Sequence, residues 1–216
     1  FWAHSSVEAV RVVMQPDDQD LYHAAVAGLD LLEPVFGGAT RQDSVRLGLE
    51  SLESPENLAP QNVLIHDAAR PFVCAAIIDG VVSALKSHAG ALPAVAVADT
   101  LKRGEDGAVV ATVPRDGLWR AQTPQGFHFA DILAAHQRFQ GEELTDDTQL
   151  FERAGRTVAL TLGTSDNFKI TTEEDLMRAE RHLRASFENR RGHSFDAHRL
   201  EGGEQVTLWG VYIPFS

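Results

Sequence analysis

The sequence predicts an α/β protein in which a mostly parallel sheet carries helices on both faces and a β-arm projects from the sheet. Strand-like and helix-like segments alternate along the first half of the chain, which favours parallel neighbours joined by right-handed crossovers. Two strand-like segments, 62–66 and 92–98, are continuously apolar, as in strands that are buried on both faces. A change of pattern after residue 99 predicts the arm.

The first half is expected to alternate regularly between strands and helices. Pro16 opens the first helix, and Asp17 and Asp18 in its first turn interact favourably with the helix dipole. The expected order is strand 7–14, helix 16–29, a strand near Val35, helix 41–52, strand 62–66, helix 77–88 and strand 92–98.

The second half is expected to begin with the β-arm, over residues 100–122. Its centre, Glu105-Asp106-Gly107, is typical of a hairpin turn. Thr172 and Asp175 resemble a capping box at the start of a late helix. The elements expected after the arm are helices 128–139 and 147–154, strand 157–162 and helix 172–187.

Composition excludes several classes of function. The 216 residues carry 31 acidic and 19 basic side chains, so the net charge is −12 and nucleic acid is not expected as a partner. An anionic small substrate needs only a local cluster of Arg and Lys. The single cysteine, Cys74, excludes an internal disulfide and suits a reducing cytoplasm. The longest apolar stretch, 92–98, is far too short to span a membrane.

The composition changes near residue 188, where glycines begin to surround two strand-like pieces. We therefore expect one domain over residues 1–188 and the first strands of another over 189–216. The chain begins at Phe1 rather than Met and ends just after a strand-like segment, so we expect it to be a segment of a longer protein.

A candidate binding site follows the buried strand 62–66, which ends in His66 and leads to Asp67 and Arg70. Ligands of open α/β sheets bind outside the carboxyl ends of the strands. Asp67 could bind a ligand hydroxyl or help to place a metal ion, and Arg70 could hold a phosphate through two hydrogen bonds. The alternative is that the two side chains pair with each other and cap the loop.

A second candidate site is the glycine turn at Gly37 and Gly38, which leads into helix 41–52. The free N–H groups at a helix N-terminus suit an anion or a polar base edge, and Arg41 and Ser44 would face the same ligand. The alternative is a tight turn in which Ser44 or Asp43 caps the helix.

Five basic residues follow strands or precede helices in this sequence. Each of them, taken singly, also fits a solvated loop. If they converge, they form a basic pocket on an acidic protein, as phosphoryl chemistry requires. These residues are Arg41, Arg70, Lys102, Arg115 and Lys169.

Asp196 and His198 form a separate candidate metal site. On a strand, residues two apart point to the same face, so the carboxylate and the imidazole could share a divalent ion. A catalytic zinc usually needs a third protein ligand, and without one an ordinary exposed pair is the alternative.

Seven segments, taken in order, resemble the 2-C-methyl-D-erythritol 4-phosphate cytidylyltransferase family over about residues 1–184. The tail, 191–199 and 210–214, resembles the opening of 2-C-methyl-D-erythritol 2,4-cyclodiphosphate synthase, which some bacteria fuse to the first enzyme. The seven segments are Gly37-Gly-Ala-Thr-Arg-Gln-Asp-Ser44, His66-Asp-Ala-Ala-Arg-Pro71, Asp99-Thr-Leu-Lys102, Pro114-Arg115, Gln122-Thr-Pro-Gln125, Thr145-Asp-Asp147 and Asp166-Asn-Phe-Lys169.

The resemblance implies a nucleotide-diphosphosugar-transferase-like (Rossmann-like) fold and a homodimer joined through the arm. It implies that CTP and methylerythritol phosphate react, with Mg²⁺, to give the CDP-alcohol and pyrophosphate. It also implies a higher oligomer if the synthase domain is complete, and a divalent ion, Zn²⁺ or Mn²⁺, in that domain.

The resemblance also implies roles for individual residues. For CTP binding these are Gly38, Ala39, Arg41, Ser44, Asp67 and Ala68. For the acceptor they are Asp67, Arg70, Thr100, Arg115, Thr123 and Lys169, of which Lys169, Arg115 and Thr123 are expected to be catalytic. For the metal ion of the synthase they are Asp196 and His198.

The family's glycine-rich N-terminal loop, which grips the triphosphate, would precede Phe1, so we expect this chain alone to transfer cytidylyl groups poorly. One alternative is a cytidylyltransferase for another polyol phosphate, such as ribitol 5-phosphate. Others are a non-catalytic dimerisation fragment and a metal-binding module built on the tail.

Overall fold

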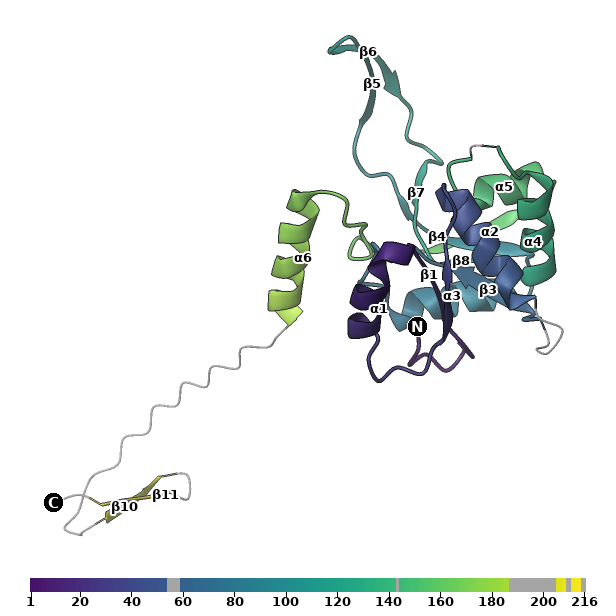
Figure 1. The fold of residues 1–216 in the computed structure, drawn as a ribbon. Coiled ribbons are helices and arrows are strands. Elements are labelled where there is room, and N and C mark those ends of the chain that lie inside the picture. Colours follow the sequence, from purple (N-terminus) through teal and green to yellow (C-terminus); the bar gives the residue numbers. More distant parts are fainter. Residues whose placement is uncertain (54–58, 143, 187–204, 209–210, 215–216) are drawn as a thin grey trace. The chain divides into compact units, whose positions relative to one another are not determined.

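The computed structural model describes residues 1–53, 59–142, 144–186, 205–208 and 211–214 (Figure 1). The chain divides into two compact units, Phe1–Leu176 and Met177–Ser216. The first unit contains the main sheet and the candidate site. The second contains most of helix α6 (Glu173–Ser186) and a two-stranded hairpin.

The first unit is built around a five-stranded sheet. Its strands are β3 (Asn62–Ile65), β4 (Gly90–Ala96), β7 (Trp119–Ala121), β8 (Gln125–His128) and β9 (Val158–Leu162). β8 and β7 lie one after the other along one edge of β4, since Gly90 and Ala91 pair with β8 and 94–96 pair with β7. β9 occupies the other edge of β4, and β3 pairs with β8. Residues 122–124, which join β7 to β8, therefore lie close to the end of β3.

The α/β class is confirmed, but the sheet is mixed, which corrects the expectation of mostly parallel strands. β3, β4 and β9 run in one direction, whereas β7 and β8 run in the opposite one. The physical reason is that the chain leaves β4 for the arm and then returns along the same edge of β4. A strand that returns directly beside the one it left is antiparallel to it.

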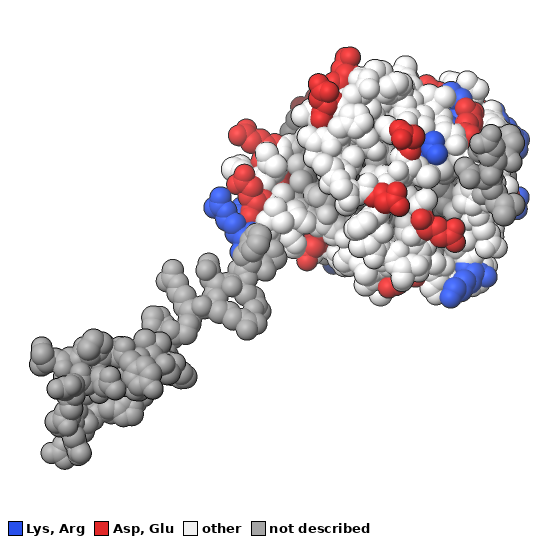
Figure 2. All heavy atoms as spheres, turned by 60° about the horizontal axis from the view of Figure 1, so that its bottom comes forward, with Lys and Arg blue, Asp and Glu red and all other residues white. Residues whose placement is uncertain are grey.

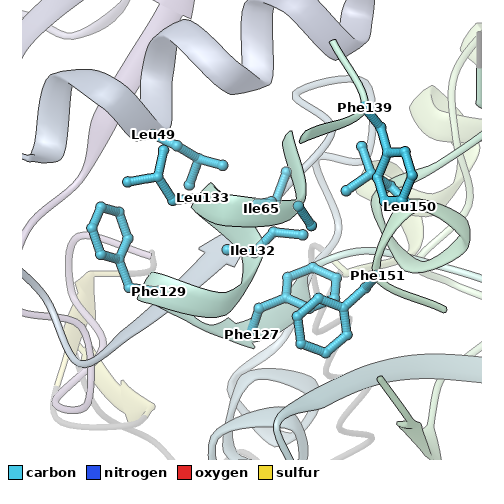
Figure 3. Close-up of a cluster of buried hydrophobic side chains, with 10 residues drawn as sticks. Leu49, Ile65, Phe127, Phe129, Ile132, Leu133, Phe139, Leu150 and Phe151 are labelled. Atoms are coloured by element: carbon cyan, nitrogen blue, oxygen red, sulfur yellow. The ribbon is translucent and has the colours of Figure 1, made fainter. Parts of the chain in front are cut away.

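Helices cover both faces of the sheet, as predicted. α3 (Ala75–Ala84) covers one face, where Val81 and Leu85 contact Ala91. α2 (Arg41–Leu52), α4 (Phe129–Arg138) and α5 (Asp147–Arg153) pack on the other face around a larger apolar cluster (Figure 3). Phe127 and Phe151 lie at its base with ring centroids 4.9 Å apart, and both are fully buried. Burial of such side chains on both faces fixes the register of the strands.

The first two strands, β1 (Arg11–Met14) and β2 (Leu32–Phe36), form a separate parallel pair. A 3₁₀ turn at Pro16–Asp18 and the short α1 (Gln19–Ala25) connect them, so the helix expected to reach residue 29 ends sooner. α2 packs closely on this pair, because a Cβ at Gly48 would lie 2.8 Å from Cγ2 of Val13.

The arm is a β-hairpin, as predicted, and Figure 1 shows it projecting from the sheet. It consists of the antiparallel strands β5 (Leu101–Glu105) and β6 (Ala108–Val113). Asp106 and Gly107 have φ angles of 48° and 78°, and a two-residue hairpin turn of type I′ needs two such left-handed residues. Val109 and Val110 beside this turn are exposed.

The predicted capping box begins α6. The N–H of Asp175 donates to Oγ1 of Thr172 at 3.2 Å, and the N–H of Thr172 donates to Oδ2 of Asp175 at 3.1 Å. In the tail, β10 (Gln205–Leu208) and β11 (Val211–Pro214) pair antiparallel. Asp196, His198 and the expected boundary near residue 188 lie outside the described residues, so these predictions remain predictions.

Figure 2 shows one face of the molecule, on which acidic and basic side chains are scattered among uncharged ones. This face carries no continuous basic surface of the kind that nucleic-acid-binding proteins present. Among the described helices, none combines the length and apolar character that a membrane span requires.

Candidate active site

The candidate site forms where β3 ends beside the interruption between β7 and β8. The N–H of Asp67 donates to Oγ1 of Thr123 at 3.1 Å, and this hydroxyl lies 3.0 Å from Nδ1 of His66. Nε2 of His66 lies 3.0 Å from the carbonyl oxygen of Arg70. A carbonyl only accepts, so Nε2 carries the proton and Nδ1 accepts from Thr123. These bonds fix the loop that carries Asp67.

Asp67 is the centre of the site. Its Oδ2 lies 3.0 Å from Nζ of Lys169 and 4.0 Å from Nε of Arg70, and its Oδ1 accepts from Arg41 at 3.3 Å. Burial alone would raise the pKa of Asp67, but the hydrogen bond from Lys169 and the charge of Arg41 lower this pKa by more than burial raises it. The pKa of Asp67 therefore lies below its ordinary value. The carboxylate is ionised and surrounded by three cations.

Arg41 also contacts a second carboxylate, that of Asp147, for which the sequence predicted no individual role. Its Nη2 donates to Oδ2 of Asp147 at 2.8 Å, and Oδ1 of Asp147 lies 3.1 Å from Nε2 of His136. Burial opposes ionisation of Asp147, but the hydrogen bond from His136 and the charge of Arg41 bring its pKa below the ordinary value. The motif at 145–147 carried a signal for Asp147, whereas His136 lies within an amphipathic helix and carried none.

Asn167 ties the Lys169 loop to the rest of the site. Its side chain is fully buried and donates to the carbonyl oxygen of Thr123 at 2.9 Å. The backbone carbonyl oxygen of Asn167 accepts from Nη1 of Arg70 at 2.9 Å. Gln122 supports the same loop by donating to the carbonyl oxygen of Thr164 at 2.7 Å. Lys169 and Arg70 are therefore held on one framework.

A polar cavity of about 200 Å³ lies over this framework. It brings together five residues that the sequence predicted and five others that it had not assigned to the site. The lining residues are Arg41, Asp67, Arg70, Thr123 and Lys169, with Ala121, Gln122, Gln125, Thr145 and Asp146. Three cations beside two carboxylates make this cavity suitable for a phosphate ester with hydroxyl groups.

The family model for 2-C-methyl-D-erythritol 4-phosphate cytidylyltransferase (IspD) matches residues 1–185. The chain belongs to this family. A bifunctional enzyme IspD/IspF of Rhodospirillum rubrum is 58% identical over 100% of this chain and 56% of its own length. Its counterpart in Paramagnetospirillum magneticum is 53% identical over 99% and 55%. The chain thus spans about half the length of the curated relatives it matches.

Solved structures of the cytidylyltransferase family have the same fold. The 4-diphosphocytidyl-2C-methyl-D-erythritol synthase of Anaerococcus prevotii is 31% identical with a TM-score of 0.75, over 84% of this chain and 81% of that one. The 2-C-methyl-D-erythritol 4-phosphate cytidylyltransferase of Thermus thermophilus is 36% identical with a TM-score of 0.68, over 83% and 84%. The resemblance stated from the sequence and the fold class are confirmed.

The glycine turn that resembles the cytidylyltransferase family's CTP side is tightly built. Thr40, rather than Ser44 or Asp43, caps α2, because its Oγ1 accepts from the N–H of Asp43 at 3.0 Å. The N–H of Gly38 donates to Oγ of Ser44 at 3.1 Å. A Cβ at Gly38 would lie 2.4 Å from Cβ of Asp43, so only glycine fits this turn.

Two of the five predicted cations do not reach the cavity within this chain. Nζ of Lys102 donates to Oγ1 of Thr112 at 2.7 Å, across the arm. Arg115 donates to the carbonyl oxygen of Ala98. The predicted basic pocket is therefore made of Arg41, Arg70 and Lys169 in the described part of one chain.

The described residues contain no group of three His, Cys, Asp or Glu side chains that could hold a metal ion. Mg²⁺ does not require one, because it keeps several waters and binds through one or two carboxylates together with substrate phosphates. Asp146 lines the cavity but caps α5, where its Oδ1 accepts from the N–H of Gln149 at 2.8 Å. Asp67 is paired with Lys169, Arg41 and Arg70, so neither carboxylate is free for the ion, and Mg²⁺ would be held mainly by substrate phosphate oxygens and water.

Proposed function

We propose that this chain transfers CMP from CTP to 2-C-methyl-D-erythritol 4-phosphate and releases pyrophosphate, in the non-mevalonate route to isoprenoids. The observation that carries the proposal is the ionised Asp67 among Arg41, Arg70 and Lys169, at the carboxyl end of a buried strand. Membership of the cytidylyltransferase family and the high identity to bifunctional enzymes support it.

The reaction replaces one phosphorus–oxygen bond of the α-phosphorus with another. An oxygen of the acceptor phosphate attacks the α-phosphorus of CTP, the bond from that phosphorus to the β-phosphate oxygen breaks, and pyrophosphate leaves with the electron pair. Such transfers depend mainly on positioning and on neutralising charge. Lys169 and Arg70 are suited to bind the acceptor phosphate, and the carboxylate of Asp67 is suited to accept hydrogen bonds from the polyol hydroxyls.

On the nucleotide side, the residues proposed to bind CTP are Gly38, Ala39, Arg41, Ser44 and Ala68. Thr123 is proposed to bind the acceptor, and its hydroxyl also supports the Asp67 loop. Mg²⁺ would be held by phosphate oxygens of CTP together with water, and it would supply positive charge to the developing pyrophosphate.

The arm is proposed to join two copies of the chain into a homodimer. Its Thr100 and Arg115, which are not among the residues that line the cavity of their own chain, would then complete the acceptor site of the other copy. We further propose that the chain is part of a cytoplasmic bifunctional enzyme. In its synthase domain Asp196 and His198 would bind Zn²⁺ or Mn²⁺, and that domain would build a higher oligomer.

Pyrophosphate release tests the proposal directly. The assay contains Mg²⁺, CTP and methylerythritol phosphate, with ribitol 5-phosphate as a parallel acceptor, and it compares this chain with a longer protein that contains it. We expect release with methylerythritol phosphate alone, and faster release from the longer protein. Release only with ribitol 5-phosphate would show that this compound is the acceptor. No release from either protein with either acceptor would contradict cytidylyl transfer.

Lys169→Met distinguishes a catalytic protein from a non-catalytic dimerisation fragment. We expect this substitution to abolish most of the release. Lys86→Met is the matched control, because Lys86 is an exposed lysine outside the cavity. Equal activity in the two variants would remove Lys169 from the mechanism.

A further inference from the structure

A buried pair of side chains lies behind the cavity, outside the residues that line it. Asp147 is the first residue of α5 and is 2% exposed, and His136 lies in the last turn of α4 and is 0% exposed. Each oxygen of Asp147 has a donor, since Oδ1 faces Nε2 of His136 and Oδ2 faces Arg41. A buried carboxylate requires such partners to remain charged.

The geometry makes His136 a hydrogen-bond donor to Asp147. A carboxylate oxygen only accepts, so Nε2 of His136 carries a proton. Nδ1 of His136 is buried and has no hydrogen-bond partner in the described part of the chain, so the contact with Asp147 is the one that orients the ring. The imidazole therefore acts as a fixed donor that turns Asp147 toward Arg41.

The shortest contact of Arg41 with these two carboxylates is the one with Asp147. Its Nη2 lies 2.8 Å from Oδ2 of Asp147, whereas its Nε and Nη2 each lie 3.3 Å from Oδ1 of Asp67. Hydrogen bonds between charged groups are strongest at about 2.7–2.9 Å. Asp147 therefore anchors Arg41 from outside the cavity, and Arg41 reaches Asp67 with two longer contacts.

Lys169 contacts the other oxygen of Asp67, and Asp147 does not anchor it. Its side chain is 43% exposed, close to the 39% of Arg41, and its ammonium lies 3.0 Å from Oδ2 of Asp67. A half-exposed ion pair on a flexible stem contributes little stability, so it can open at low cost. Of the two close cations at Asp67, Arg41 is restrained and Lys169 is able to leave.

We propose that His136 and Asp147 are positioning residues that keep Arg41 shared between two carboxylates, so that Oδ2 of Asp67 can exchange Lys169 for a polyol hydroxyl. This inference rests on the proposed function for the identity of the substrate. As Lys169 moves to the acceptor phosphate, the restrained Arg41 keeps Asp67 charged and in place. The exchange leaves the number of ion pairs in the site unchanged.

Loss of either positioning residue should upset this sharing in opposite directions. In Asp147→Asn, Arg41 is released and can take both oxygens of Asp67, which blocks the hydroxyl site. In His136→Leu, the carboxylate of Asp147 is free to turn and take Arg41 with both oxygens. Asp67 is then left with Lys169, which is harder to release to a phosphate.

Steady-state kinetics of the active protein provide the first test. We expect both variants to raise the KM for the polyol phosphate about tenfold, as for the loss of one charged hydrogen bond, while kcat at saturation changes much less. His136→Gln should restore the KM, because its amide N–H can replace Nε2–H. Ile132→Val, one turn earlier on α4, is the control for a change in packing, since Ile132 is fully buried and apolar.

The second test needs no substrate and so separates this inference from the proposed function. The ¹³C resonance of the Asp67 carboxyl, assigned with Asp67→Asn, reports the pKa of Asp67 in each variant. We expect the pKa to rise in His136→Leu, where Arg41 withdraws, and to return in His136→Gln. An unchanged pKa in His136→Leu, or a KM equal to that of Ile132→Val, would overturn the inference. A protein that turns over neither acceptor but shows the pKa shift would refute the function alone.

Discussion

Asp67→Asn should make the site bind inorganic phosphate more tightly while turnover falls. The substitution keeps the shape of the side chain but removes the negative charge that holds Lys169 at 3.0 Å. A unit charge about 5 Å from a bound phosphate is worth about 3 kcal/mol at an effective dielectric constant of 20. Because Lys169 and Arg41 are each about 40% exposed, screening reduces this to about 1–2 kcal/mol. Phosphate affinity should therefore rise about tenfold.

Isothermal titration calorimetry with inorganic phosphate at low and moderate salt measures this change. Glu174→Gln, an exposed position in the first turn of α6, alters the net charge equally and serves as the control. Turnover in Asp67→Asn should fall at least tenfold, since a hydrogen bond to a charged acceptor is lost. Phosphate affinity that is unchanged or weaker in Asp67→Asn would refute the view that this carboxylate competes with the substrate for Lys169.

Three further predictions follow from the same geometry. The pKa values of Asp67 and Asp147 are lowered in the folded state. Their contribution to stability is therefore complete above the unfolded pKa of about 3.9 and is lost as the pH falls through the folded pKa values. Acid unfolding followed by circular dichroism should show less acid sensitivity in Asp147→Asn than in the parent chain. Lys169→Met should reduce turnover about a hundredfold but change the melting temperature by no more than about 2 °C, because its ion pair is half-exposed. Gly126→Ala should destabilise the fold by about 1–3 kcal/mol in urea, because the new Cβ would lie 2.5 Å from Cγ1 of Val81, and an unchanged midpoint would contradict the close packing of α3 on β8.

Local signals in the sequence predicted the elements whose ends are set by neighbouring residues. The helix Arg41–Leu52 and the turn at Asp106 and Gly107 agree with their predictions, because a capping residue and a pair of left-handed residues act over a few positions. β8 was missed for the opposite reason. Gln125 is 2% exposed and hydrogen-bonded within the protein, yet beside Thr123 it reads as part of a polar loop.

The candidate site shows the same division. Asp67, Arg70 and Lys169 follow or precede regular elements, so the sequence could indicate them singly. The contact of Arg41 with Asp147 joins residues 106 positions apart, and no local pattern reports such a distance. His136 lies on the buried face of α4, where sequence periodicity predicts packing rather than chemistry.

The ion pairs of the site suggest how a protein with a net charge of −12 would handle the two anionic substrates that we propose for it. Arg41, Arg70 and Lys169 are matched by Asp67, Asp146 and Asp147, so the described part of the site has almost no surplus positive charge. On the proposed function, phosphate would therefore be bound by exchange of partners at Asp67 rather than by attraction to an open basic surface. Exchange can serve one phosphate group, but a triphosphate beside a phosphate ester requires additional cations. We expect these to come from Mg²⁺ and from Arg115 on the arm of a second copy, which makes activity depend steeply on both magnesium concentration and dimerisation.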